Sequence, residues 1–386
     1  MMMPAVESTS VAVADLLRLG AEAEILGPSA LRAAVAEAVD ALHRVHRRRP
    51  APRGGGRAAG GGAYPAGPRK RDRRGGSDVR IGVIGLGDIA HKAYLPVLTT
   101  RPGVQPHLHT RTRATLDRVG DTYRVPARQR HSDLDALIEA RPDAAFVHAP
   151  TEDHPALVTR LLTAGIPTYV DKPLAQRLDE AESVVGLAED LGVGLAVGFN
   201  RRYAPAYAQL VNHPRDLIVL QKHRKGLPED PRRMVYDDFI HVVDTLRFLA
   251  PSGVDRVTVA CRARDGLLDH VVLQLAGEGF TAVGIMNHRS GSAEEILEVS
   301  GQDAKREVRN LAEIIDHKGQ PSVRRRGDWV SVARQRGIEQ AAVAFLDAVG
   351  AGRTPSARDA LRTHELCERI VLAAYEEGGA AVTPRR

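Results

Sequence analysis

The sequence predicts an α/β protein with a doubly wound parallel sheet, followed by a second domain built on a meander of strands. Two observations predict this fold. Between Asp78 and Asn200, short apolar runs alternate with helical stretches, and strands separated by whole helices pair in parallel. After Pro214, strand-like runs follow one another with only turn residues between them, which is typical of antiparallel neighbours.

The elements can be assigned in chain order from their hydrophobic periodicity. In the parallel domain, strands are expected over 79–85, 104–110, 143–150, 166–173 and 194–200, and helices over 89–100, 113–123, 134–140, 154–165 and 178–191. Pro96 should bend or end the first of these helices. In the second domain, strands are expected over 216–224, 254–263, 270–288, with turn residues at Gly277 and Gly279 inside this range, and 294–301. Two closing helices are expected near 334–349 and 357–376.

Composition excludes several classes of protein. The 386 residues contain no run of apolar side chains long enough to span a membrane, and the first residues lack a basic segment before their short apolar run. We therefore expect a cytoplasmic protein with no membrane partner. The two cysteines, Cys261 and Cys367, match no disulfide or metal pattern and are expected to be small core residues.

The net charge of +6 belongs to the amino-terminal extension. Residues 1–77 contain 13 Lys or Arg and 7 Asp or Glu, which leaves 41 of each kind in the remainder. Residues 46–76 are rich in Gly, Pro and Arg and nearly free of large apolar side chains, so residues 47–77 are expected to be a disordered linker. A phosphate-binding arm for nucleic acid is the less favoured alternative, because the segment lacks interleaved aromatic residues and a folded reader beside it.

Residues 1–46 are expected to form a short helical extension. Pro28 and Ser29 precede apolar residues at helical spacing, which indicates one amphipathic helix. The stretch 11–46, with "GAEAEILGPSALR", resembles the tail of the ligand-sensing module of WYL-type transcriptional regulators. Because the DNA-binding part of such a regulator is missing, we interpret the stretch as a remnant. The remaining chain divides into a dinucleotide-binding domain, 78–200, and a substrate and oligomerisation domain, 201–386.

A glycine turn at "IGVIGLGDIAHKAYLP", residues 81–96, follows the first strand and opens a helix. In this context Gly85 would allow the tight turn, Gly87 would let the backbone approach a pyrophosphate, and Ala90 would pack the helix on the strand. The phosphates would accept hydrogen bonds from amides at the helix start, near Asp88 and Ile89. The alternative is a turn that binds no ligand.

The end of the second strand favours one nicotinamide cofactor over the other. NAD sites usually have an acidic residue about 20 residues past the glycines, where it bonds the ribose hydroxyls. No acidic residue lies between Asp88 and Asp117, and "LHTRTR" instead provides Thr110, Arg111 and Arg113. Because arginine matches a phosphate dianion, we expect NADP, with NAD as the alternative.

Four motifs behind the glycine turn carry a family resemblance. They are "FVHAPTEDH", "YVDKPLA", "VGFNRRYAP" and "DDFIHVVDTLRFL", in this order. Together they resemble the Gfo/Idh/MocA oxidoreductases, and within them the MviM-type branch, over about residues 79–378. The resemblance implies a Rossmann domain followed by an α/β domain with an open, mostly antiparallel sheet. It also implies that one face of this sheet covers the active site and the other makes contacts in a homo-oligomer.

Two positions are expected to carry the chemistry. Lys172, in "DKP", follows a parallel strand, where ligands of open α/β sheets bind, and the family's matching lysine lies beside the nicotinamide. Asp237, His241 and Asp244 are spaced by four and three residues, which would place them on one helix face. A histidine flanked by two carboxylates suits acid–base catalysis, because its pKa is near neutrality and can be tuned upward. A metal site is the disfavoured alternative, because no further ligand is apparent.

Several residues near these motifs are weaker candidates. Pro150 and His154 match the family's loop after the fourth strand, where His154 either contacts the cofactor or caps a helix. Asn200 lies at the domain junction, next to Arg201 and Arg202, which either contact ligand or form structural ion pairs. Asp171 stands where the family more often has Glu. Lys222 and Arg224 could face a carboxylate or phosphate on the substrate.

The sequence thus predicts an NADP-preferring or NAD-using oxidoreductase that transfers a hydride to or from a secondary alcohol of a sugar, polyol or related molecule. The alternative is a nucleotide-binding sensor or scaffold without turnover. The combination of Lys172, Asp237 and His241 favours the enzyme, because a protein that only binds a nucleotide does not need these three side chains.

Overall fold

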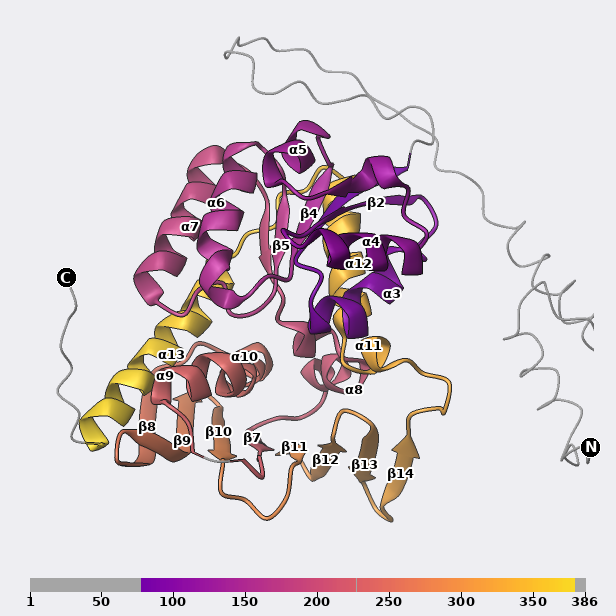
Figure 1. The fold of residues 1–386 in the computed structure, drawn as a ribbon. Coiled ribbons are helices and arrows are strands. Elements are labelled where there is room, and N and C mark those ends of the chain that lie inside the picture. The colour runs from indigo at the N-terminus through magenta and orange to yellow at the C-terminus, as the bar shows by residue number, and fades with distance from the viewer. Residues whose placement is uncertain (1–77, 227, 379–386) are drawn as a thin grey trace, which may run out of the picture. The chain divides into compact units, whose positions relative to one another are not determined.

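The computed structural model describes residues 78–226 and 228–378, which contain two sheets and the helices packed on them (Figure 1). The first sheet has six parallel strands, which in spatial order are β3 (Arg130–His131), β2 (Val104–His109), β1 (Val79–Ile84), β4 (Ala144–Val147), β5 (Thr168–Val170) and β6 (Leu195–Val197). The expected doubly wound parallel sheet is therefore confirmed. Its strand order reverses between β1 and β4, so the crevice for a ligand lies at their carboxyl ends.

Helices cover both faces of the first sheet. One face carries η1 (Ala90–Tyr94), α3 (Leu95–Leu98), α4 (Arg113–Thr122) and α12 (Ile338–Gly350), and the other carries α5 (Leu134–Glu139), α6 (His154–Thr163) and α7 (Leu178–Leu191) (Figure 1). The apolar residues of β1 alternate between the two cores, with Ile81 and Val83 on the α12 side and Ile84 on the α6 side. The chain therefore returns from the second sheet to complete the core of the first.

Helix limits follow local chemistry. The helix α7 begins and ends where the sequence predicts, and Gly192 terminates it in the left-handed conformation with φ +62°. The helix expected over 89–100 ends earlier and contains a widened π turn, η1, immediately before Pro96. Proline has no N–H to donate to the carbonyl four residues earlier, which disfavours a regular α turn at this point.

The second sheet is mostly antiparallel, as expected, but it is not one continuous meander. In spatial order its strands are β14 (Ser322–Arg325), β13 (Glu313–His317), β12 (Ala304–Arg309), β11 (Glu295–Gly301), β7 (Leu217–Lys222), β10 (Phe280–Asn287), β9 (Leu267–Gly277) and β8 (Arg256–Arg264). The first strand, β7, lies between two meanders and pairs in parallel with β10. The sequence did not indicate β12 to β14, because these strands are short and carry many charged residues.

One face of the second sheet is covered by α9 (Pro231–Arg233), α10 (Ile240–Leu249) and α13 (Arg358–Glu377) (Figure 1). Gly284 of β10 allows close packing of α10, because a Cβ there would lie 2.6 Å from Val242. Alternate residues of β10, such as Val283 and Ile285, are half-buried and belong to the opposite face.

The two sheets are joined by short elements that build the site described below. These are η4 (Asn200–Tyr203), α8 (Pro205–Ala208), η5 (Gln209–Asn212), the π turn η6 (Met234–Phe239) and α11 (Val332–Gln335), while η2 (Ala127–Gln129) and η3 (Thr151–Asp153) lie in loops of the first sheet. No helix among the described residues is both long and apolar enough to cross a membrane. The expected helix within 1–46 and the linker 47–77 lie outside the described residues.

Candidate active site

The glycine turn after β1 has a geometry that requires glycine at its first position. Gly85 has φ +86°, and a Cβ there would lie 2.5 Å from the backbone nitrogen of Ala149. A Cβ on Gly87 would meet nothing within 4 Å, so the turn leaves open space in front of its backbone. Ala90 is fully buried, whereas Ile89 is exposed. These features fit the approach of a pyrophosphate to the backbone.

A cavity of about 340 Å³ lies beside this turn, at the carboxyl ends of β1, β2 and β4. Of the predicted cofactor residues, Gly85, Thr110, Arg111 and Pro150 line it. Gly87, Asp88 and Arg113 do not: Asp88 pairs with Lys92 at 2.7 Å, and Arg113 pairs with Asp117 at 2.8 Å along α4.

The cavity also contains charged residues that the sequence did not indicate. Asp133, Asp153 and Arg160 line it, together with Ser132. A guanidinium nitrogen of Arg111 lies 3.4 Å from a carboxylate oxygen of Asp153, and the Arg111 side chain is 83% exposed. Carboxylates therefore reach this cavity from the loops after β3 and β4 rather than from the end of β2.

His154 and Asn200 contact the backbone around the site. The two ring nitrogens of His154 lie 2.8 Å and 2.9 Å from the carbonyl oxygens of Pro173 and Ala149. Burial lowers the pKa of His154, although both hydrogen bonds oppose this effect. The Asn200 amide donates to the carbonyl oxygen of Arg336 at 2.6 Å. Both side chains thus position loops, and neither lines the cavity beside the glycine turn.

Lys172 lies directly after β5 and contacts the second domain. Its ammonium nitrogen lies 2.5 Å from the carbonyl oxygen of Asp237. Burial lowers the pKa of Lys172, although the charges of Asp237 and Asp238 oppose this. The contact brings the carboxyl edge of the first sheet against the π turn η6, so the two parts of the described chain meet at Lys172.

Asp171, beside the lysine, belongs to a buried network that the sequence did not reveal. Its two carboxylate oxygens accept hydrogen bonds from the Tyr94 hydroxyl at 2.6 Å and from His148 Nδ1 at 2.9 Å. The rings of Tyr94 and His148 stack with centroids 3.9 Å apart. Burial would raise the pKa of Asp171, but the His148 charge and these hydrogen bonds outweigh it and lower the pKa. The network holds the residue before Lys172 in one orientation.

The environment of His241 differs from the expected one. Burial is the largest cause of a strongly lowered pKa, and the charges of Arg201, Lys222, Lys172 and Arg336 lower it further. The expectation that two flanking carboxylates would tune the pKa of His241 upward was therefore wrong. The π turn η6 interrupts the regular helix between Asp237 and His241, so the assumed spacing of one helix face does not hold there. A His241 ring in these surroundings is neutral at pH 7.

Asp244 does not join this group. Its carboxylate is 1% exposed and accepts hydrogen bonds from Arg202 at 2.6 Å and 2.8 Å and from the Thr363 hydroxyl at 3.1 Å. Arg202 in turn contacts Asp359 at 2.6 Å. Burial raises the pKa of Asp244, although Arg202 opposes the shift. Asp244 and Arg202 thus connect η4, α10 and α13 and are structural ion-pair partners.

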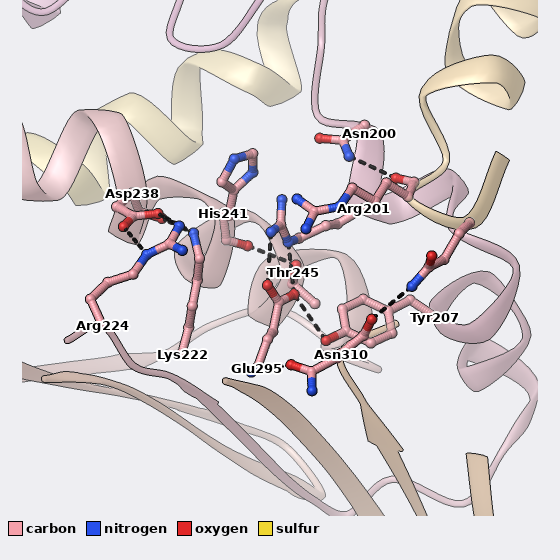
Figure 2. Close-up of polar contacts among 12 residues, drawn as sticks. Asn200, Arg201, Tyr207, Lys222, Arg224, Asp238, His241, Thr245, Glu295 and Asn310 are labelled. Atoms are coloured by element: carbon pink, nitrogen blue, oxygen red, sulfur yellow. Dashed lines mark hydrogen bonds and ion pairs between the residues drawn. The ribbon is translucent and has the colours of Figure 1, made fainter. Parts of the chain in front are cut away.

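Two ion-pair clusters lie near His241 (Figure 2). In the first, the Asp238 carboxylate accepts hydrogen bonds from two nitrogens of the Arg224 guanidinium, at 2.6 Å and 2.8 Å, and also pairs with Lys222. In the second, Arg201 donates twice to Glu295, at 2.8 Å and 2.7 Å, and the Tyr207 hydroxyl donates to the same carboxylate at 3.0 Å.

The charges of the two clusters act on one another. Burial and the charge of Arg201 lower the pKa of Lys222 to about 7, although Asp238 and Glu295 oppose this. The Lys222 ammonium also lies 3.0 Å from the carbonyl oxygen of Asp238, and Lys172 contacts the preceding carbonyl, that of Asp237. Cations from both sheets therefore meet at η6. The described residues contain no group of three or more His, Cys, Asp or Glu that could hold a metal ion.

Three family models match the chain. The model of the Gfo/Idh/MocA oxidoreductase family with an NAD-binding Rossmann fold matches residues 79–199, and a YceM-like C-terminal domain matches residues 205–318. A WCX domain model matches residues 5–42, which agrees with the expected resemblance of this stretch to WYL-type regulators.

Individual relatives cover most of the chain. YceM of Salmonella typhimurium is 33% identical over 307 residues, which are 78% of this chain and 98% of that protein. The crystal structure of the dehydrogenase MviM from Clostridium difficile superposes with a TM-score of 0.71 at 28% identity and covers 77% of this chain and 100% of that one.

A relative of named activity covers less of the chain. The inositol 2-dehydrogenase of Mycolicibacterium smegmatis is 31% identical over 198 residues, which are 47% of this chain and 56% of that protein. The long match to YceM, the match of the NAD-binding model to the glycine turn and the likeness to MviM agree with one another. The chain belongs to the Gfo/Idh/MocA oxidoreductase family.

Proposed function

We propose that the protein transfers a hydride between a nicotinamide cofactor and a secondary alcohol of a sugar, polyol or related molecule. The observation that carries this proposal is the contact of Lys172 with the turn that precedes His241. Lys172 follows a strand at the carboxyl edge of the nucleotide-binding sheet, and its ammonium nitrogen lies 2.5 Å from the carbonyl oxygen of Asp237 in η6, directly before the helix of the second domain that carries His241. The relative named inositol 2-dehydrogenase supports a polyhydroxylated substrate.

The residues present fit the proposed reaction. A bound nicotinamide would accept or release the hydride. In the oxidation direction the neutral His241 ring would take the proton of the alcohol oxygen as the carbon–oxygen double bond forms. The Lys172 ammonium would stabilise the negative charge that develops on the same oxygen. In the reduction direction the protonated ring would return the proton.

NADP is the cofactor that we propose in preference to NAD. Thr110 and Arg111 line the cavity where the adenosine end would bind, and the exposed guanidinium of Arg111 can turn toward a 2′-phosphate. Asp153 holds Arg111 only at 3.4 Å, so a phosphate can replace this contact. Asp133 is the residue that would favour NAD instead, because its carboxylate lines the same cavity and could bond the ribose hydroxyls.

We further propose a homo-oligomer that uses the face of the second sheet opposite α10, which no helix of residues 78–226 and 228–378 covers. Val283 and Ile285 of β10 and Val219 of β7 are half-buried on the face opposite α10. A central row of apolar side chains on an uncovered sheet face is typical of a protein–protein contact.

The test measures turnover by the full chain with NADP⁺ and a panel of sugars, cyclitols and sugar acids. The absorbance of the reduced cofactor reports the rate. Lys172→Ala and His241→Asn should each lower kcat by about two to four powers of ten, because each removes a group that acts in the transition state. NADPH affinity, measured by fluorescence, should remain within a few-fold of the parent. Because both groups serve one oxygen, their effects should be less than additive in the double variant.

Controls distinguish this mechanism from general damage. Lys318→Ala changes an exposed residue directly after β13 and should retain parental kcat. Near-parental kcat in Lys172→Ala or His241→Asn would show that the residue does not have the proposed role. If the protein binds NADPH but turns over none of the panel, a nucleotide-binding sensor or scaffold becomes the better explanation.

A further inference from the structure

A small hollow lined by cations lies beside His241, where β7 and β11 meet the loop before α12. Its volume is about 120 Å³, and one lysine and three arginines line it: Lys222, Arg201, Arg224 and Arg336. Two carboxylates, Glu294 and Glu295, also line it. The volume suits a small charged group such as a carboxylate or phosphate.

The positive charges of the hollow are incompletely neutralised. Glu295 is bonded to Arg201, and a single carboxylate, that of Asp238, serves both Lys222 and Arg224. Glu294 accepts a hydrogen bond from the Ser292 hydroxyl at 2.6 Å.

Arg336 is the cation without a partner. Within residues 78–226 and 228–378, its guanidinium donates no hydrogen bond and makes no ion pair. Burial lowers the pKa of Arg336, and the charges of Arg201 and Arg224 add to this, with Glu295 opposing. A cation that faces other cations and has no counter-ion can be stabilised by an anion that binds between them.

The backbone holds Arg336 at this position. Its carbonyl oxygen accepts the hydrogen bond from Asn200 at 2.6 Å. The next residue, Gly337, has φ +80°, and a Cβ there would lie 2.2 Å from the carbonyl oxygen of Asn200 and 2.3 Å from the nitrogen of Ala204. Only glycine allows this close crossing of the two chain segments. The free guanidinium is therefore presented by a fixed backbone.

The hollow adjoins the proposed reaction centre. Arg201, Lys222 and Arg336 line it, and the charges of the same three residues lower the pKa of His241. Figure 2 shows His241 beside Arg201, with Lys222 and Arg224 on one side and Glu295 on the other. An anion in the hollow would thus belong to a molecule whose hydroxyl lies at His241.

We propose that this hollow binds a carboxylate or phosphate group of the substrate, so that sugar acids or phosphorylated sugars are preferred to neutral polyols. The proposal rests on the proposed function for the identity of the reacting hydroxyl. Arg336 supplies the free charge, and Arg201, Lys222 and Arg224 supply the surrounding positive field. An arginine suits both anions, because its planar fork can donate two parallel hydrogen bonds.

The first experiment measures anion binding without turnover. Inorganic phosphate and acetate are titrated by calorimetry into the full-length protein at low salt. Loss of one charge-assisted contact typically weakens binding about tenfold or more, so Arg336→Gln should weaken the binding of at least one anion by this factor. Arg334→Gln is the matched control, because Arg334 is an exposed arginine two residues away that pairs with Glu339 and does not line the hollow. Equal binding by parent and Arg336→Gln would overturn the proposal.

The second experiment compares matched substrates in the NADP⁺-linked assay. Glucose, glucuronate and glucose 6-phosphate separate a neutral molecule from a carboxylate and a phosphate. The parent should show about tenfold or higher kcat/KM for one of the two anions than for glucose. Arg336→Gln should remove this preference mainly through KM, and Arg336→Lys should restore part of it. Arg334→Gln should leave it unchanged.

The two readouts separate the two proposals. Turnover that favours neutral glucose, or a preference that survives Arg336→Gln, would overturn the anion site while leaving the proposed dehydrogenase intact. Anion binding that depends on Arg336 in a protein that turns over nothing would keep the site and overturn the proposed function. A protein that shows neither turnover nor anion binding dependent on Arg336 would overturn both proposals.

Discussion

His364 is expected to couple the stability of the protein to pH. Its ring is fully buried, Nε2 accepts a hydrogen bond from the Leu174 amide at 3.0 Å, and Nδ1 donates to the Ala360 carbonyl at 2.9 Å. Burial lowers its pKa to about 4, and the bond to Ala360 opposes this. Protonation would turn Nε2 into a donor that faces another donor, and would loosen the loop that carries Lys172.

The sign and size of the effect follow from this pKa. In the unfolded chain a histidine has a pKa of about 6.5, so between roughly pH 6.5 and 4 the unfolded state binds the proton and the folded state does not. Stability from this residue is therefore present above pH 6.5 and lost as the pH falls through this window. A difference of about 2.5 pH units corresponds to about 3 kcal/mol in the free energy of unfolding.

The perturbation is His364→Gln, because an amide can accept from one neighbour and donate to the other without titrating. The free energy of unfolding is measured in urea at several pH values from 7.5 to 4.5 by far-UV circular dichroism, since the single tryptophan, Trp329, is fully exposed. In His364→Gln the free energy of unfolding should fall less steeply as the pH is lowered. The difference in slope is at most that of one bound proton, about 1.4 kcal/mol per pH unit. His270→Gln, at an exposed site, should not. The same pH dependence in His364→Gln and the parent would refute the reasoning.

Two further predictions concern residues whose surroundings differ from expectation. Arg111→Asp should shift the binding preference from NADPH to NADH, and Asp153→Asn, which frees Arg111, should tighten the binding of NADPH. Fluorescence titrations of both nucleotides measure these affinities. Unchanged NADPH affinity in both variants would exclude a role for Arg111. Asp244→Asn should cost on the order of 2–4 kcal/mol of stability, because it removes one partner of a buried ion pair, while kcat of the remaining folded enzyme stays within a few-fold of the parent. Urea unfolding and turnover measured on the same sample test this, and a large loss of kcat without loss of stability would return Asp244 to the catalytic residues.

Features set by neighbouring residues could be predicted from the sequence. The parallel sheet, the glycine turn and the limits of α7 depend on local periodicity, on Gly85 and on Gly192, and all can be recognised in short windows. The position of β7 between two meanders could not be predicted, because strand order depends on tertiary pairing rather than on the strand's own residues.

The candidate site was harder to predict because its partners are far apart in the chain. The end of β2 carries no acidic residue, but Asp133 and Asp153 bring carboxylates to the same cavity from later loops, which the sequence around β2 could not indicate. The surroundings of His241 were inferred from the neighbouring Asp237 and Asp244, whereas its pKa is lowered by burial and by charges on other elements, those of Arg201, Lys222, Lys172 and Arg336. For the ion pairs of Asp238, the local sequence offered a single signal, which is that Asp238 stands next to Asp237 in "DDFIH".

Cations around His241 suit a role as a general base better than the expected carboxylates would. A histidine between two carboxylates would be largely protonated at neutral pH and unable to accept the proton of an alcohol. Burial and the nearby cations instead keep the His241 ring neutral, so the ring is ready to accept it. An anion bound beside Arg336 would offset part of this positive field and raise the pKa of His241. The ring would then become a stronger base only when an acidic substrate is in place, which couples recognition of the substrate's charge to removal of its proton.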